Sequence, residues 1–245
     1  MRAALEHFAP HYKELRQRLI AVFIAIALAS TISYLYIDQI AGFCMRPLFQ
    51  AYPELGHLVY TKLTEAFVSY IKLSILVGIG ITFPFLLYQL WMFIAPGLLE
   101  HERRLARQIV GWATLLFAGG GLFAFFVVLP RMLTFFMSYA TGNLQPMPKL
   151  GLYLTFVART VLAFGIAFEI PFLMVMAMKT GLVSRHYFTG KRPWFYVAIV
   201  TLSFLLAAGD LTATALLSVP LFGLYESGII IGTLLARRQL KKTSH

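Results

Sequence analysis

The sequence predicts an all-α integral membrane protein with six transmembrane helices, and three observations support this fold class. First, 59% of the 245 residues are hydrophobic and 13% are charged, whereas soluble domains carry roughly 25% charged residues. Second, apolar stretches of about 20 residues, the length that spans a hydrocarbon core of about 30 Å, recur along the chain. Third, lysine and arginine gather in alternate connections between these stretches, as the positive-inside rule describes.

The apolar stretches set the bounds of the expected helices, which form one polytopic membrane domain over residues 1–245. We expect helices at about 19–40, 67–94, 109–136, 152–178, 194–208 and 211–235. The first stretch is interrupted only near its end, by Asp38 and Gln39. Thr64 and Glu65 stand where an N-cap residue and a first-turn acid would open the second helix.

The later elements are bounded by charges and helix breakers. The third and fourth stretches each carry one arginine near an end. The last apolar region, 194–235, is too long for one span, and Gly209-Asp210 divides it into a short fifth helix and a sixth. Pro47 falls in an expected outer loop of about 41–66, since proline is common where a helix has stopped.

The distribution of basic residues predicts the orientation. Fifteen of the 21 lysines and arginines fall at one set of helix ends, comprising both termini and the connections at about 97–108 and 179–193. We expect these ends to be cytoplasmic, at the inner face of the cell (cytoplasmic) membrane. The net charge of +11 is then a topology signal and an attraction to anionic lipid, not a sign of nucleic-acid binding.

The sequence contains no pattern that predicts catalysis or a cofactor. It has no nucleophile elbow, His-Glu-x-x-His motif or phosphate loop, and no histidine falls deep in an expected span. Cys44 is the single cysteine, so an intramolecular disulfide and a Cys/His metal cluster are excluded. We therefore expect no enzymatic activity, no metal and no cofactor.

Two glutamates stand out on the basic, cytoplasmic side. Glu14 precedes Arg18 by four residues, so the two side chains can pair on one helix face. Glu102 lies in the connection before the third helix. The simplest role of both is local charge neutralisation. The sharper hypothesis is an acidic patch for a positively charged ligand, because guanidinium pairs with carboxylate in bidentate geometry.

Three more polar residues lie inside the apolar stretches, where a charge is by default a functional hypothesis. Glu169 is the only charged residue within 162–178. It is poorly placed to pair with Arg159, and we expect it to face water or a partner. Glu226 lies in the sixth helix, where a helix–helix hydrogen bond is slightly favoured. Gln89 fits a structural hydrogen bond and a groove-lining role equally well.

Five stretches, distributed over nearly the whole chain, point to a known family. They are HYKELRQRL at 11–19, TEAFVSYIK at 64–72, FPFLLYQLWMFIAPGLLEHERR at 83–104, FGIAFEIPF at 164–172 and PLFGLYESGI at 220–229. In content and order they resemble the TatC family, the multi-span core subunit of the twin-arginine protein translocase. The third stretch is the most distinctive.

The resemblance implies a six-helix receptor with cytoplasmic termini and a concave, cupped arrangement of helices. Such proteins bind the twin-arginine signal peptides of folded precursors and assemble with single-span TatA/TatB-type partners, and the proton-motive force drives transport. Self-association in a larger complex is also implied. The positions that match the family's signal-peptide site are Glu14 and Glu102, with Arg16 and Phe93 nearby.

For contacts inside the membrane, the resemblance implies Glu169, which in the family faces a partly wet groove, with Gln89 and Glu226 as further polar candidates. Other family-matched positions are Pro47, Thr64, Glu65 and Asp210. The chain departs from the family pattern around Asp210, because glycine precedes it where proline is common and fewer polar residues follow it.

Two other function classes stay open at this point. One is a proton-coupled secondary transporter that uses Glu169 or Glu226, although the sequence shows no paired, interrupted helices in two matching halves. The other is a structural membrane scaffold.

Overall fold

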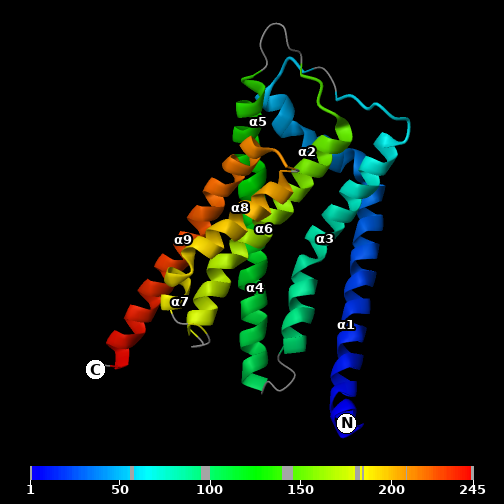
Figure 1. The fold of residues 1–245 in the computed structure, drawn as a ribbon. Coiled ribbons are helices and arrows are strands. Elements are labelled where there is room, and N and C mark those ends of the chain that lie inside the picture. The colour runs from blue at the N-terminus through cyan, green and yellow to red at the C-terminus, as the bar shows by residue number, and fades with distance from the viewer. Residues whose placement is uncertain are drawn as a thin grey trace. The chain divides into compact units, whose positions relative to one another are not determined.

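A computed structural model gives the fold of the 245-residue chain (Figure 1). The structure describes residues 2–55, 58–94, 100–139, 146–179, 183, 185–207 and 209–243. Over these residues the chain is almost entirely helical, and β-type pairing is confined to an isolated bridge between Val59 and Lys149. The all-α prediction is therefore confirmed.

The helices follow one another with short connections. They are α1 (Arg2–Leu35), α2 (Ile37–Ala51), α3 (Glu65–Ile94), α4 (Glu100–Phe123), the π-helical segment η1 (Ala124–Val128), α5 (Leu129–Met137), α6 (Leu150–Lys179), α7 (Arg185–Gly190), α8 (Arg192–Leu206) and α9 (Leu211–Thr243). Five stretches are long and apolar enough to cross a membrane, namely Tyr12–Leu35, Glu65–Leu90, Ile109–Met137, Leu150–Met178 and Leu211–Leu234. The shorter apolar helix α8 is the sixth, as the sequence predicted.

The expected outer loop at 41–66 is wrong in its first part, because residues up to Ala51 form α2. The residues Ile37, Ala41, Cys44 and Leu48 are all buried, and their spacing is that of one helix face. Pro47 consequently lies inside a helix rather than in a loop. Burial of this face outweighs the backbone hydrogen bond that proline removes.

Two further differences concern the third expected helix and the connection before α8. The third helix begins earlier, at Glu100, and passes through the π-helical turn η1 before α5. Pro130 lies at the start of α5, and a wider turn accommodates a residue that cannot donate to the preceding turn. The short helix α7 was not predicted, since six residues are too few to show a periodic pattern.

The contacts divide the chain into two compact units. Unit 1 comprises Met1–Met45, Leu58–Leu115 and Pro148–Ala158. In it, α1 packs along α3 (Figure 1). This approach requires glycine at Gly78, because a Cβ there would lie 2.8 Å from the backbone nitrogen of Ser30.

Unit 2 comprises Arg46–His57, Leu116–Met147 and Arg159–His245. Within it, α8 packs against α9 (Figure 1), and the rings of Phe195 and Tyr225 stack at 4.9 Å between centroids. The Tyr225 hydroxyl donates a hydrogen bond of 2.8 Å to the carbonyl oxygen of Phe188 in α7. These contacts fix α7 and the start of α8 against the middle of α9.

Candidate ligand-binding site

A charged cluster on α1 and α3, in unit 1, contains two of the predicted site residues, Glu14 and Gln89. Arg18 donates from Nε and Nη2 to Oε1 of Glu14, at 3.1 and 2.5 Å. Its Nη1 donates to Oε1 of Gln89 on α3 at 3.0 Å. The predicted pairing of Glu14 with Arg18 is confirmed, and Gln89 extends it across the two helices.

The cluster leaves part of Glu14 available to a ligand. Both hydrogen bonds from Arg18 use Oε1, and within the described part of the chain Oε2 accepts none. The Glu14 side chain is 33% exposed and that of Arg18 is 20% exposed. A second guanidinium group could therefore approach Oε2 without first displacing Arg18, although Arg18 already neutralises part of the carboxylate charge.

The other residues of the predicted signal-peptide site lie on the same unit but differ in how far they are described. Arg16 is exposed on α1. Phe93 is half-buried in the last turn of α3, four residues after Gln89 and so on the same helix face. Glu102 belongs to the first turns of α4, and its side chain lies outside the described residues.

Glu169 lies in α6, within unit 2, and its side chain is buried, with 5% exposure. Its carboxyl group is within hydrogen-bonding reach of the backbone of Phe117 in α4. Its Oε1 atom has no hydrogen-bond partner among the described residues. Within the described ranges, no ion pair joins it to Arg159.

Glu226 is engaged by two side chains from α8. Arg192 donates from Nη2 to Oε2 at 2.9 Å, and the Tyr196 hydroxyl donates to Oε1 at 2.6 Å. The favoured interpretation, a helix–helix hydrogen bond, is confirmed. The sequence could not name these partners, because they precede Glu226 by 34 and 30 residues and meet it only when α8 packs on α9.

Other family-matched residues lie at the starts of helices α3 and α9. Glu65 Oε2 accepts hydrogen bonds from the backbone N–H of Thr61 at 2.8 Å and from its hydroxyl at 3.2 Å, while the Thr64 carbonyl begins α3 by accepting from Val68. Asp210 caps α9, accepting from the backbone N–H of Ala213 at 2.7 Å. Asp210 is thus a side-chain N-cap, whereas no cap hydrogen bond from the Thr64 side chain is seen among the described residues, so the N-cap expected at Thr64 stays a prediction.

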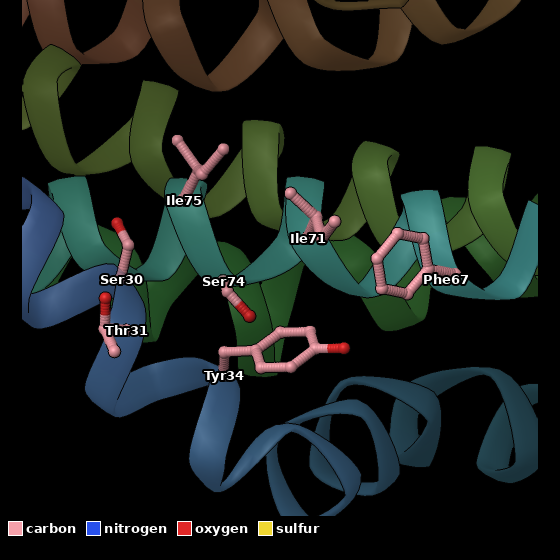
Figure 2. Close-up of a pocket in the computed structure, with 7 residues that line it drawn as sticks. All are labelled: Ser30, Thr31, Tyr34, Phe67, Ile71, Ser74 and Ile75. Carbon is pink, nitrogen blue, oxygen red and sulfur yellow. The ribbon is translucent and has the colours of Figure 1, made fainter.

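A hollow of about 310 Å³ lies farther along α1 and α3 (Figure 2). Its lining consists of Ser30, Thr31, Tyr34, Phe67, Ile71, Ser74 and Ile75. Thr31 and Ser74 donate their hydroxyl hydrogens to carbonyl oxygens one turn back on their own helices. None of the predicted binding residues lines the hollow, so it is separate from the cluster at Glu14.

Across the described residues, no group of His, Cys, Asp and Glu is arranged to hold a metal ion.

Comparison with known proteins decides the family. Residues 10–220 match the family described as Sec-independent protein translocase protein (TatC). The chain belongs to the TatC family. A TatC from Desulforapulum autotrophicum is 33% identical over 223 residues, covering 91% of this chain and 83% of the relative. A TatC from Aquifex aeolicus is 35% identical, covering 94% of this chain and 95% of the relative.

The fold agrees with solved TatC structures. A crystal structure described as the twin arginine translocase receptor TatC superposes with a TM-score of 0.83 at 35% identity, covering 91% of this chain and 98% of that one. A second, of the same receptor in the detergent DDM, gives a TM-score of 0.82 at 34% identity. This TatC chain is thus a multi-pass membrane protein of a protein-transport family.

The family match extends over most, but not all, of the polar features. The matched range, 10–220, includes Glu14, Gln89, Glu102 and Glu169 and ends before Glu226. The Arg192–Glu226 pair joins a residue inside this matched range to one beyond it.

Proposed function

We propose that this TatC chain is the receptor and core subunit of a twin-arginine translocase, and that it is not an enzyme. It binds the twin-arginine signal peptides of folded precursor proteins at the cytoplasmic face of the inner membrane. It then nucleates assembly with single-span TatA/TatB-type proteins for export driven by the proton-motive force. The solved relatives named as twin arginine translocase receptors support this proposal.

The observation that carries the proposal is the cluster of Glu14, Arg18 and Gln89. It holds a carboxylate in place through a guanidinium group of the protein itself, so the geometry needed for a ligand arginine is already formed. Preorganisation of this kind lowers the cost of binding, because the side chains are ordered beforehand. The Oε2 atom of Glu14 takes one arginine of the signal, and Glu102 takes the other.

Arg16 and Phe93 supply the surroundings of this site. Arg16 is exposed and repels a signal that presents its arginines in the wrong register. Phe93 offers apolar surface at the end of α3 for the hydrophobic residues that follow the two arginines. Both roles depend on the peptide lying across α1 and α3.

The test is direct binding of a peptide with two consecutive arginines followed by an apolar helix. Glu14→Ala combined with Glu102→Ala should abolish binding to the purified protein, and replacing both peptide arginines with lysine should weaken it, since lysine cannot pair bidentately. Glu54→Ala, which removes an exposed carboxylate elsewhere, is the matched control. Undiminished binding by the double variant would refute the proposed site.

One observation favours the alternative of a proton-coupled transporter, namely the buried, partly unpartnered carboxyl group of Glu169. Glu226 supports it less, because both of its oxygens accept hydrogen bonds from α8. Glu169→Ala should leave peptide binding intact and impair assembly with single-span partners. Loss of a proton-linked solute flux in that variant would instead establish the transporter.

A further inference from the structure

A second hollow of about 310 Å³ lies in unit 2, where α7 meets α8. It is lined by Tyr187, Lys191, Trp194, Phe195 and Ala198. One end of this group carries the Lys191 ammonium, and the other is apolar. Trp194 is 73% exposed and Tyr187 is 45% exposed, as is common for aromatic residues at a membrane interface.

Hydrogen bonds hold the backbone around Lys191 at the junction of α7 and α8. Its N–H donates to the carbonyl oxygen of Tyr187 at 3.1 Å, and its own carbonyl accepts from the N–H groups of Trp194 and Phe195. The Lys191 ammonium lies 4.6 Å from the centre of the Tyr187 ring. The start of α8 adds the positive end of a helix dipole beside this cation.

Lys191 is a cation to which the described part of the chain offers no ion-pair partner. The neighbouring carboxylate, Glu226, is taken up by Arg192 and Tyr196. A cation without a counter-charge, next to an apolar hollow at the end of a membrane helix, matches an anion that carries a hydrocarbon chain.

We propose that the hollow lined by Tyr187, Lys191, Trp194, Phe195 and Ala198 binds an anionic phospholipid. The phosphate of the headgroup pairs with the Lys191 ammonium and accepts from the Trp194 indole N–H. An acyl chain follows the apolar surface of Trp194 and Ala198 along α8. Basic pockets at the membrane interface are suited to such headgroups. This site is distinct from the signal-peptide site on unit 1 and does not depend on it.

Trp194 is itself the probe for the test. The chain has three tryptophans. When Trp91 and Trp112 are replaced by phenylalanine, Trp194 is the only one left. The full-length protein is placed in phosphatidylcholine nanodiscs containing equal fractions of brominated phosphatidylglycerol or brominated phosphatidylcholine. We expect brominated phosphatidylglycerol to quench Trp194 more strongly than brominated phosphatidylcholine does, as if its concentration beside Trp194 were roughly fivefold higher. This is the preference for anionic lipid that one lysine near a membrane surface provides.

Substitutions test whether Lys191 causes the preference for phosphatidylglycerol. Lys191→Gln should abolish it, Lys191→Arg should keep it, and Lys72→Gln, which removes an exposed cation on α3, should leave it unchanged. Equal quenching by the two lipids in the unsubstituted protein would overturn the proposal, as would a preference that survives Lys191→Gln. Soluble glycerol 3-phosphate should not compete at the same concentration. If it did, the site would be one for free phosphate esters.

Discussion

Gln89 is the residue that ties the predicted peptide site together. It accepts a hydrogen bond from Arg18 and so holds α1 and α3 in one register at the level of Glu14. Gln89→Ala removes one charge-assisted hydrogen bond, which contributes about 1 kcal/mol in a partly exposed position. We expect a lower thermal midpoint of the detergent-solubilised protein and weaker binding of the twin-arginine peptide, because Arg18 is then free to move.

Gln17→Ala is the control for this change. Gln17 is an exposed residue on α1, and its replacement removes the same chemical group without touching the cluster. Gln89→Ala should lower the thermal midpoint and the peptide affinity, whereas Gln17→Ala should leave both unchanged. Equal behaviour would mean that the link between Arg18 and Gln89 contributes nothing in solution.

The reactivity of the Cys44 thiol tests whether this face of α2 is buried. Burial raises the pKa of the Cys44 thiol to about 11, and Cys44 is 8% exposed. Burial therefore favours the neutral thiol in the folded protein. The stability of the folded state is unaffected by the thiol below the unfolded-state pKa of about 8.5. It falls as the pH rises from there toward the folded-state pKa of about 11. We expect almost no alkylation by iodoacetamide at pH 8 (about one thiol in a thousand ionised), measured by intact mass.

The comparison for Cys44 is an exposed thiol in the same protein. Ser138→Cys in a Cys44→Ala background places a cysteine at an exposed helix end and should react at the rate of a free peptide. If Cys44 reacted as fast at pH 8, α2 would not bury it.

At the scale of elements, adjacent glycines in α4 give a sharp prediction about helix packing in unit 2. A Cβ on Gly120 would lie 2.5 Å from the carbonyl oxygen of Phe164 in α6, whereas one on Gly119 would meet nothing within 4 Å. Gly120→Ala should therefore destabilise the protein by about 1–3 kcal/mol through overpacking. Gly119→Ala should be neutral or stabilising, because alanine favours the helix. Thermal unfolding of both variants in the same detergent distinguishes them, and equal midpoints would contradict the α4–α6 contact.

The elements also show which features the sequence could predict. The long apolar spans and the Glu14–Arg18 pair are local, and both were predicted. The helix α2 was predictable as well, since Ile37, Ala41, Cys44 and Leu48 already have helical spacing, but the nearby Pro47 favoured a loop. The links from Arg18 to Gln89 and from Arg192 to Glu226 were not predictable. They join residues far apart in sequence, and their formation depends on the register of packed helices.

At the scale of the whole molecule, the orientation in the membrane depends on the short helix α8. Its 15 residues rise about 22 Å, which is less than a hydrocarbon core of about 30 Å. If α8 crosses a bilayer that thins locally around it, the spans number six and both termini lie on one side. If it does not cross, the termini lie on opposite sides. The basic residues at the two termini favour the first arrangement.

Reporter fusions to truncated chains decide between these arrangements. A fluorescent protein that folds only in the cytoplasm, fused after Gly190, should be bright, because this point precedes α8. Fused after Asp210, just before α9, it should be dark, and an alkaline phosphatase at the same point should be active. Fused after His245 it should be bright again, as α9 returns the chain to the cytoplasm. A bright reporter after Asp210 together with a dark one after His245 would show that α8 does not span, and would place the basic C-terminal residues on the outer side.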